Sequence, residues 1–371
     1  MKIIAAPAFK NRAGNPYNSL LYSHMQAEVS EFSNRVAPDG SYAILHFHWP
    51  ERELNTRWNP LIILARLWLK LFIMRRWRAR GTKIVWTVHN LKSHEHAHPR
   101  LERWFWRRFT AQLDGVIALS GDGLNAARRE HPAVVSLPGF VIPHGHYRGA
   151  YPDHPGVDAR AVLGIDPQAK VFLFFGKIRP YKNVPALIAA FHELPGEELR
   201  LYIVGEPSNA DNAEEVRRMA AVDSRIRVHF EHVPADFVEN YFRAADLVVL
   251  PYREIVNSGT ALLALSFDRP VVVPLKGAMG ELAAAVGDAW VRTYSDQLGA
   301  EVLRQSLVWA ANTARPREAP LDAFAWSTLA AQTLAAFQQL VAIETGAHRI
   351  DRVRPRLPLQ KNTMQSIRRD Q

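Results

Sequence analysis

The sequence contains no cysteine among its 371 residues. Disulfide bonds and thiolate metal sites are therefore excluded, and the chain is compatible with a reducing compartment. Long apolar runs are missing as well. The opening residues 1–14 carry Lys2 before a short apolar stretch, which predicts a first β-strand rather than a signal peptide. The most apolar segment, residues 58–80, is interrupted by Arg66 and Lys70 and is too short to span a bilayer.

Acidic residues are in deficit, because 36 Asp and Glu face 46 Lys and Arg, giving a net charge of +10. A basic surface suits nucleic acid, anionic lipid or a phosphorylated small molecule. The last residues, 349–371, hold seven basic and two acidic side chains, or +5, with no helical or strand period. We expect a disordered tail over 346–371, and the alternative is a weak electrostatic anchor to anionic lipid. No nucleic-acid module is visible, so no nucleic-acid partner is expected.

Short apolar, β-branched runs alternate with amphipathic segments of helical length. This alternation predicts an α/β fold whose parallel sheets carry helices on both faces. The chain is too long for one ordinary core, and residues 138–170, rich in Pro, Gly, His and Asp, look like a linker between two halves. The expected strands are residues 2–5, 42–47, 83–88, 115–119, 171–175, 199–204, 226–230, 247–250 and 270–273.

Two segments of the first half mix aromatic and basic residues. Residues 58–80 are apolar on almost every side up to Met74 and then become basic, and residues 103–108 repeat the theme as Arg-Trp-Phe-Trp-Arg-Arg. The first of these is either a core helix or a helix lying in a membrane interface, where Trp and Arg are favoured. Both interpretations stay open at the level of sequence.

A small-residue turn, Asn257-Ser258-Gly259-Thr260, follows the expected strand 247–250 and opens an apolar helix. Ser and Thr cap helix N-termini, and a helix start offers unpaired N–H groups to a phosphate. Gly259 would let phosphate oxygens approach the backbone. A structural cap alone would explain Ser258 equally well.

A cationic loop strengthens the phosphate interpretation. The sequence Gly176-Lys177-Ile178-Arg179-Pro180-Tyr181-Lys182-Asn183 follows the expected strand 171–175 in the same half. Opposite a helix N-terminus, Arg179 and Lys182 would clamp a pyrophosphate, Arg by its planar fork and Lys as a point charge.

Polar strand ends also occur in the first half. His46 and His48 with Glu51 follow one expected strand, and His89 and Asn90 with His94 and Glu95 follow the next. An imidazole or carboxylate of near-neutral pKa can take a proton from a sugar hydroxyl. The base candidates are Glu95, then Glu51, then His48. The alternate histidines 94, 96 and 98 lack the helical i, i+4 spacing with a third ligand, so no metal site is expected.

These motifs together resemble a known pattern. HFHWPE (46–51), TVHNLKSHE (87–95), IPHGHYRGAY (142–151), FGKIRPYKN (175–183) and LPYREIVNSGTALLALSFDRPVVVP (250–274) are similar, in this order, to the bacterial β-1,4-mannosyltransferases of exopolysaccharide assembly. The resemblance implies a GT-B fold, in which two Rossmann-like domains face an interdomain cleft. It predicts an acceptor domain at 1–150, a nucleotide-sugar domain at 151–320, a helix crossing back at 321–345 and the tail at 346–371.

The resemblance further implies an inverting glycosyltransferase that moves mannose from GDP-mannose, in β-1,4 linkage, to a lipid-linked oligosaccharide. Ile255 and Leu263 fall where related retaining enzymes carry two glutamates, which favours inversion. No metal or other cofactor is expected, and the enzyme should lie peripherally on the cytoplasmic face of the plasma membrane. The alternatives are a UDP-sugar donor, such as UDP-glucuronate or UDP-glucose, and a non-catalytic nucleotide-binding membrane scaffold.

Site residues follow from these roles. The diphosphate is expected at Gly176, Arg179, Lys182, Ser258, Gly259 and Thr260. The donor sugar or nucleoside is expected at His89, Asn90, Glu206, His232, Val233, Tyr252 and Asn257. Three residues at the domain junction, His144, His146 and Arg148, could close over the donor.

Overall fold

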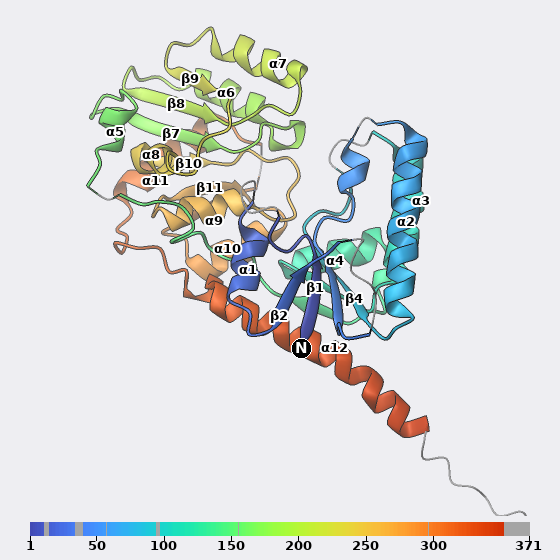
Figure 1. Ribbon diagram of the computed structural model, residues 1–371. Helices are drawn as coiled ribbons and strands as arrows, with labels where there is room; N and C mark the ends of the chain where they lie inside the picture. Colours follow the sequence, from blue (N-terminus) through green and yellow to red (C-terminus); the bar gives the residue numbers. More distant parts are fainter. Residues whose placement is uncertain are drawn as a thin grey trace, which may run out of the picture.

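The computed structural model describes residues 1–10, 15–33, 40–56, 58–93, 97–154, 156–295 and 297–351, with side chains up to residue 343. Two domains, each built on a six-stranded parallel sheet, lie side by side (Figure 1). The first sheet has the order β2-β1-β3-β4-β5-β6. Its strands are β1 (Lys2–Ala6), β2 (Glu28–Glu31), β3 (Ile44–Phe47), β4 (Lys83–Val88), β5 (Gly115–Ala118) and β6 (Gly139–Val141).

The second sheet has the order β12-β11-β10-β7-β8-β9, again all parallel. Counted from β7, this is the strand order of a dinucleotide-binding Rossmann fold. Strands such as β11, Val-Val-Val-Pro, are buried along their whole length, as expected of a sheet covered on both faces. The strands are β7 (Lys170–Phe175), β8 (Leu199–Val204), β9 (Ile226–His229), β10 (Leu247–Val249), β11 (Val271–Pro274) and β12 (Val291–Tyr294).

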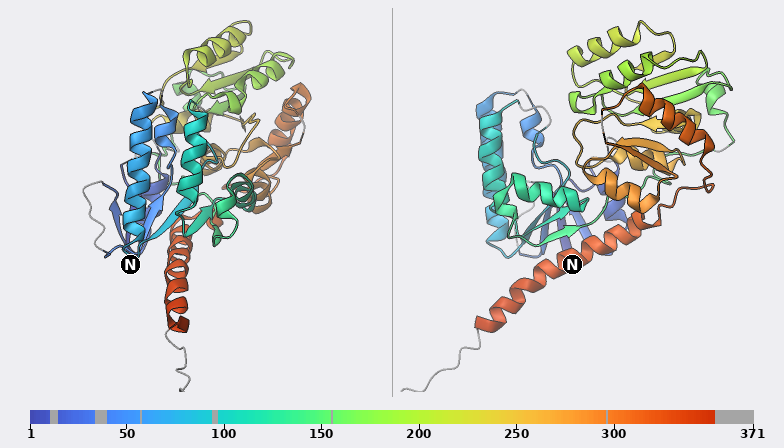
Figure 2. Two further views of the ribbon diagram at one scale, coloured as in Figure 1. Left: turned by 90° about the vertical axis from the view of Figure 1, so that its right-hand side faces the viewer. Right: turned by 180° about the vertical axis from the view of Figure 1, so that it is seen from behind.

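Helices cover both faces of the first sheet. One face packs against α2, α3 and α4, and the other against α1 and the C-terminal helix α12 (Trp326–Asp351). Figures 1 and 2 show α12 running from the second domain beneath the first sheet and extending past it. Leu329, Phe337 and Leu340 share one buried cluster with Ile3 and Val85, so this helix completes the core of the first domain. The other helices here are α1 (Tyr17–Ser23), η1 (Arg52–Asn55), α2 (Pro60–Arg78), α3 (Pro99–Thr110), α4 (Gly121–Glu130) and η2 (Pro132–Val134).

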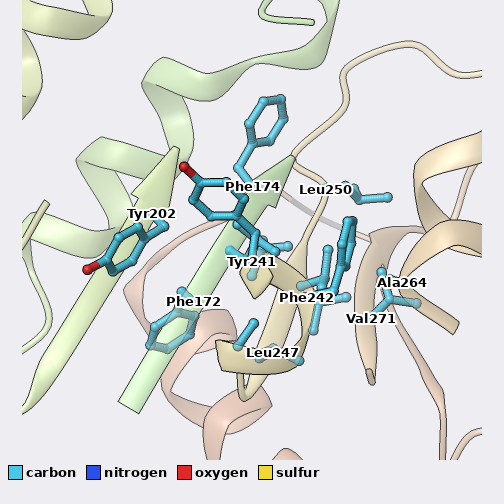
Figure 3. Packing of buried hydrophobic residues seen from close by; sticks show 14 of the residues in the cluster. Phe172, Phe174, Tyr202, Tyr241, Phe242, Leu247, Leu250, Ala264 and Val271 are labelled. Carbon is cyan, nitrogen blue, oxygen red and sulfur yellow. The ribbon is translucent and has the colours of Figure 1, made fainter. Parts of the chain in front are cut away.

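The core of the second domain forms around β7, β8 and β10. Phe172, Phe174 and Phe242 pack between these strands and the neighbouring helices (Figure 3). Aromatic rings fill this layer, and Phe172 meets Phe191 edge to face at a centroid distance of 5.7 Å. The helices are α5 (Ala159–Val162), η3 (Pro180–Lys182), α6 (Val184–His192), α7 (Ala210–Ala220), α8 (Val238–Ala244), α9 (Gly259–Ser266), α10 (Ala278–Val286), α11 (Ala300–Asn312) and η4 (Asp322–Phe324).

Helix α2 has both a buried apolar stripe and exposed apolar side chains. Asn59 caps its first turn by accepting from the N–H of Leu61, with Pro60 at the first helical position. One stripe faces the core, while other large apolar side chains are exposed, among them Trp68 at 59 %. Within the described ranges, none of the helices is both long and apolar enough to cross a lipid bilayer. The buried stripe is Ile63, Leu67, Leu71, Met74 and Trp77.

Three expectations about the elements need correction. The segment 138–170 is not a plain linker, because it contains the edge strand β6 of the first sheet and helix α5, which packs on α8. Strands β2 and β12 were missed, since Glu28–Glu31 is polar and half-exposed and Val291–Tyr294 has one buried residue. The helix predicted to cross back at 321–345 begins at Trp326 and continues to Asp351. Residues 352–371 of the expected tail lie outside the described residues.

Candidate active site

The second sheet reverses its strand order between β7 and β10. These strands are hydrogen-bonded neighbours, yet the chain leaves β7 toward β8 on one side and β10 toward β11 on the other. Open parallel sheets bind their ligands outside the carboxyl ends of the strands at such a reversal. The loops that leave these two strand ends are Gly176–Asn183 and Pro251–Ser258, which carry both motifs predicted to hold phosphate.

Gly176 lies where three groups converge. Its φ of +113° is a conformation that other residues rarely adopt. A Cβ built on Gly176 would lie 3.1 Å from Lys182 Nζ and 3.4 Å from Thr260 Oγ1. The glycine, the lysine and the first turn of α9 therefore border one small space.

Within the described residues, the two predicted cations form no ion pair with a carboxylate. Lys182 Nζ lies over the rings of Tyr252 and Phe174, at 5.3 and 5.8 Å from their centroids. Burial, followed by the neighbouring Arg179, lowers the pKa of Lys182. Arg179 has a buried Nε without a hydrogen-bond partner in the described part of the chain. Lys177 differs, because it is exposed and pairs with Glu206 at 3.8 Å.

The N-terminus of α9 lies against the domain junction. Ser258 Oγ caps the helix by accepting from the N–H of Ala261 at 3.2 Å. A Cβ on Gly259 would approach Tyr147 Oη to 2.9 Å and His144 Nε2 to 3.5 Å. A side chain at this position would therefore collide with the Tyr147 hydroxyl, which explains a glycine at the helix start.

Neutral polar rings line the first-domain side. Tyr22 Oη lies 2.7 Å from His46 Nδ1 and 2.6 Å from His48 Nε2, and His48 Nδ1 lies 2.9 Å from His89 Nε2. Burial, then the neighbouring imidazoles, holds the pKa of His48 well below its usual range. Both nitrogens of His48 are occupied and the residue is 1 % exposed, so the geometry argues against His48 as the base.

Of the two carboxylate base candidates, Glu51 is the one that lies within the described residues. One carboxylate oxygen accepts from Asn90 Nδ2 at 2.8 Å, and the other is buried without a partner in the described structure. Burial raises the pKa of Glu51 to about 7. The carboxyl group is 1 % exposed, behind Asn90. Glu95, the first base candidate, lies outside the described residues.

The three junction residues have different surroundings. His144 borders α9, and burial lowers its pKa to about 4. His146 braces α12, because its carbonyl accepts from Trp326 Nε1 at 2.6 Å. Arg148 pairs with Asp268 at 2.5 Å and Glu318 at 3.2 Å in the second domain. The predicted closure of Arg148 over the donor is therefore not supported, since its guanidinium already holds structural ion pairs.

The remaining predicted residues lie at different depths. Asn257 reaches across the junction, with Nδ2 at 3.5 Å from the carbonyl oxygen of His89, and its buried Oδ1 has no partner in the described chain. Tyr252 is buried under Lys182. His232 is exposed, whereas Val233 belongs to the second-domain core and offers no polar side-chain group.

Several residues at this site were missed in the sequence. Tyr17, on α1, has its ring centroid 4.8 Å from both His89 and His144 and thus links the end of β4 to the domain junction. Glu281, on α10, accepts from the N–H groups of Gly121 and Asp122 at 3.0 Å, so it caps α4 across the junction. The contacts of Tyr17, Tyr22 and Glu281 join residues that are far apart in the sequence, so no local motif predicts them.

Cavities and metal clusters do not mark this site. Two depressions of about 440 Å³ each lie on the second domain, and neither is lined by the clamp residues. Among the described residues, no group of three or more His, Asp or Glu side chains could hold a metal ion. The strand reversal and the charges of Arg179 and Lys182 are therefore the features that point to this site.

Comparisons with known proteins agree with this geometry. A family model described as "Glycosyl transferases group 1" matches residues 169–304. GDP-mannose:glycolipid 4-beta-D-mannosyltransferase from Xanthomonas campestris pv. campestris is 32% identical over 295 residues, which are 79% of each chain. D-inositol 3-phosphate glycosyltransferase from Rhodococcus erythropolis is 26% identical over 74% of this chain and 64% of its own.

Solved structures share the fold across nearly the whole chain. Sucrose-phosphate synthase from Thermosynechococcus elongatus superimposes with a TM-score of 0.61 at 16% identity, covering 95% of this chain and 98% of that one. HepE from Anabaena, in complex with UDP and glucose, gives 0.59 at 18% identity, covering 95% and 100%. The predicted GT-B arrangement of two parallel sheets is confirmed. The chain is therefore a glycosyltransferase, and it belongs to the group 1 glycosyl transferases in the family of the GDP-mannose:glycolipid 4-beta-D-mannosyltransferase.

Proposed function

We propose that the enzyme transfers mannose from GDP-mannose, with inversion and in β-1,4 linkage, to a lipid-linked oligosaccharide of bacterial exopolysaccharide synthesis. The observation that carries the proposal is the pair of cations, Arg179 and Lys182, in the loop at the strand reversal, where Lys182 Nζ borders the same space as Thr260 at the start of α9. The named activity of the Xanthomonas relative supports the choice of donor and acceptor.

The second domain stabilises the leaving group in this scheme. An acceptor hydroxyl oxygen forms a bond to the anomeric carbon while the bond from that carbon to the diphosphate oxygen breaks. Negative charge grows on the diphosphate, where Arg179, Lys182 and the N–H groups at Gly259 and Thr260 receive it. These groups replace a divalent cation, so the reaction needs no added metal.

A base in the first domain takes the proton of the acceptor hydroxyl. Glu95 remains the first candidate by its place in sequence, four residues beyond Leu91 in the segment after β4, and Glu51 is the second. The variants Glu95→Gln and Glu51→Gln separate the two, since the amide keeps the shape and removes the basic oxygen. The base is the residue whose Gln variant loses turnover while its affinity for the nucleotide stays normal. Loss of turnover in neither variant would remove both from the role.

Inversion is supported by the residue at the position where related retaining enzymes carry a glutamate. Leu263, where related retaining enzymes carry a glutamate, is buried in the second-domain core on α9. No ionised group can contact the nucleoside from there. The anomeric configuration of the product, read from its one-bond carbon–proton coupling by NMR, tests this directly, and an α-linked product would contradict the proposal.

A UDP-sugar is the second candidate for the donor, and the favouring observation is the likeness to HepE, which was solved with UDP and glucose. A thermal-shift screen with GDP, UDP and dTDP separates the candidates, because a bound nucleotide stabilises the native state by mass action. We expect the largest shift with GDP. Transfer from GDP-mannose, and not from UDP-glucose or UDP-glucuronate, is the matching activity result, and absence of any transfer or hydrolysis would favour a non-catalytic scaffold.

Peripheral binding to the cytoplasmic face of the plasma membrane completes the proposal. The surface that we call the α2 face consists of exposed apolar side chains followed by exposed arginines on the same helix. Such a combination suits the interface of an anionic bilayer, where each basic residue contributes about 1 kcal/mol. The α2 face comprises Leu61, Ile62, Leu64, Trp68, Leu69 and Phe72, with Arg75, Arg76, Arg78 and the adjoining Arg80.

Vesicle sedimentation tests the α2 face. Replacing Arg75, Arg76, Arg78 and Arg80 by Ser should release the protein from vesicles containing anionic lipid while nucleotide binding is retained. A matched control replaces four exposed arginines of the second domain, Arg217, Arg218, Arg304 and Arg317, and should sediment like the wild type. Equal binding of wild type and the α2 variant would contradict this part of the proposal.

A further inference from the structure

Five side chains form one unbranched hydrogen-bonded chain through the first domain. Thr87 Oγ1 lies 2.7 Å from His46 Nε2, and His46 Nδ1 lies 2.7 Å from Tyr22 Oη. Tyr22 Oη lies 2.6 Å from His48 Nε2, and His48 Nδ1 lies 2.9 Å from His89 Nε2. The chain begins inside the sheet on β4, passes through β3 and α1, and ends at His89 beside the second domain.

Every member of this chain is neutral at ordinary pH. Burial lowers the pKa of His46 to about 3 and holds the pKa values of His48 and His89 well below their usual range. Burial raises the pKa of Tyr22 well above its usual range. Each imidazole therefore carries one hydrogen, and each hydroxyl carries one. The five side chains carry one such hydrogen each, and each of the four contacts between them uses one. One hydrogen therefore remains at one end of the chain.

The buried end of the chain, Thr87, determines the direction in which its hydrogen bonds run from donor to acceptor. Thr87 is almost completely buried, and within the described residues His46 is the only hydrogen-bond partner of its hydroxyl. If His46 donated to Thr87, the hydroxyl hydrogen would be buried without an acceptor, which is unfavourable because a buried donor loses its bond to water and gains none. If Thr87 donates to His46 Nε2, every contact is satisfied in turn. His46 then donates to Tyr22, Tyr22 donates to His48, and His48 donates to His89 Nε2.

The remaining hydrogen then lies on His89 Nδ1. The ring of His89 is stacked on Trp49 at 4.4 Å and meets Tyr17 edge to face at 4.8 Å, so its orientation is set on both faces. His89 is half-buried, and its Nδ1 has no partner in the described part of the chain. This nitrogen is free to meet a ligand.

His144, whose ring centroid also lies 4.8 Å from that of Tyr17, has the opposite polarity. Its Nδ1 lies 2.8 Å from the carbonyl oxygen of Gly145 and must donate to it, because a carbonyl can only accept. The lone pair of His144 is therefore on Nε2, which borders Gly259 and lies 3.4 Å from Tyr147 Oη, so this nitrogen accepts from the phenol. The acceptor nitrogen of His144 is thus used within the protein, whereas His89 Nδ1 can donate to a ligand.

We propose that Thr87 is a positioning residue that sets the tautomer of His89 through His46, Tyr22 and His48, so that His89 meets the substrate as a neutral hydrogen-bond donor to a sugar hydroxyl and not as a base. The identity of that ligand rests on the proposed function. The tautomer itself does not, because it follows from the hydrogen bonds of the protein alone.

Histidine nitrogen NMR on the full chain without ligand tests the tautomer. Long-range proton–nitrogen spectra of ¹⁵N-histidine protein distinguish a protonated from a bare ring nitrogen, and His89→Asn assigns the signals of His89. We expect His89 to be protonated on Nδ1 and bare on Nε2. In Thr87→Val, which removes the hydroxyl, we expect a mixture of both tautomers, and Thr87→Ser should restore the wild-type spectrum. A wild-type His89 protonated on Nε2, or an unchanged tautomer in a folded Thr87→Val, would overturn the proposal.

A matched pair of substitutions tests the role in turnover. Asn places an amide N–H close to the position of Nδ1, whereas Asp offers only acceptors at neutral pH. If His89 donates, His89→Asn should stay within about tenfold of wild-type turnover and His89→Asp should lose more, since one hydrogen bond contributes about 0.5–1.5 kcal/mol. The reverse order would show a base and contradict the proposal. Failure of the wild type to use GDP-mannose would refute the proposed function and leave the NMR result standing.

Discussion

The two domains meet at the active site with different chemistry. The second domain offers cations and a helix N-terminus, and in the described structure it leaves Arg179 and Lys182 without carboxylate partners. The first domain offers imidazoles and phenols whose pKa values are shifted by burial toward the neutral form. The difference agrees with the proposed division of labour, in which one domain would receive a charged diphosphate and the other would hydrogen-bond neutral hydroxyls.

Removing a cation should have the largest effect. We expect Lys182→Ala and Arg179→Ala each to lower turnover with saturating donor by about 10²–10³-fold, because one preorganised contact to developing charge contributes about 2.7–4 kcal/mol. Initial rates of GDP release provide the measurement. Lys177→Ala is the control, since Lys177 is exposed and pairs with Glu206. Near-normal turnover of both the Arg179 and the Lys182 variant would contradict the assignment of the diphosphate to the second domain.

A substitution of Glu51 tests whether burial in the first domain disfavours a charged side chain. Its folded-state pKa of about 7 lies above the ordinary value of 4.5 for a glutamate, so between these two pH values the folded state holds a proton that the unfolded state has lost. The stability of the wild type should therefore fall as the pH rises through this range, with the full penalty present above pH 7. Glu51→Gln keeps an oxygen for Asn90 and should be more stable than the wild type by about 1–3 kcal/mol at pH 8.

The same comparison at pH 5 serves as the control, because Glu51 is then protonated in the folded protein. Denaturant titrations of both proteins at the two pH values give the difference. A stability gain that is equal at pH 5 and pH 8 would show that charge burial is not its cause.

Gly259 tests how closely the domains meet at the helix end. A Cβ at this position would lie 2.9 Å from Tyr147 Oη, so Gly259→Ala should displace the phenol or the first turn of α9. We expect weaker binding of the donor by up to about tenfold, which corresponds to 1.4 kcal/mol. Calorimetric titration with GDP measures the change. Gly149→Ala is a useful comparison, since a Cβ at Gly149 meets no atom within 4 Å, although its φ is +73°. Unchanged affinity in Gly259→Ala would place the diphosphate elsewhere.

The smallest expected effect concerns metal. If cations and helix N–H groups stabilise the leaving group, EDTA should leave the initial rate unchanged within error. Loss of activity with EDTA, restored by Mg²⁺ or Mn²⁺, would mean that the second domain works through a bound cation rather than through Arg179 and Lys182.

The second-domain clamp could be predicted because its parts are local in sequence. A strand, a glycine and cations follow one another in 171–183, and a strand, small residues and a helix follow one another in 247–266. The sequence alone does not show that β7 and β10 are neighbours in the sheet. The Rossmann strand order places them side by side.

The first-domain chain could not be predicted in the same way. His46 reaches Thr87 because β3 and β4 pair in one register, His46 opposite Val85, and Tyr22 reaches both histidines from a separate helix. A shift of one residue would turn these side chains to the other face of the sheet. The sequence shows histidines at strand ends, but it does not show which nitrogen of each ring is occupied, and for this reason His48 was a plausible base.

The path of α12 has a consequence for synthesis on the ribosome. The first domain presents Ile3, Ala5 and Val85 on a sheet face that Leu329, Phe337 and Leu340 cover in the finished protein. Between residues 150 and 340 the ribosome adds the whole second domain, which takes about 10–40 s at about 5–20 residues per second. Throughout that time the nascent first domain exposes an apolar face, and only the arrival of the last helix removes it. The N-terminal domain is thus translated first and completed last, and a chain stopped before Trp326 would be an aggregation-prone fragment and a natural client for chaperones.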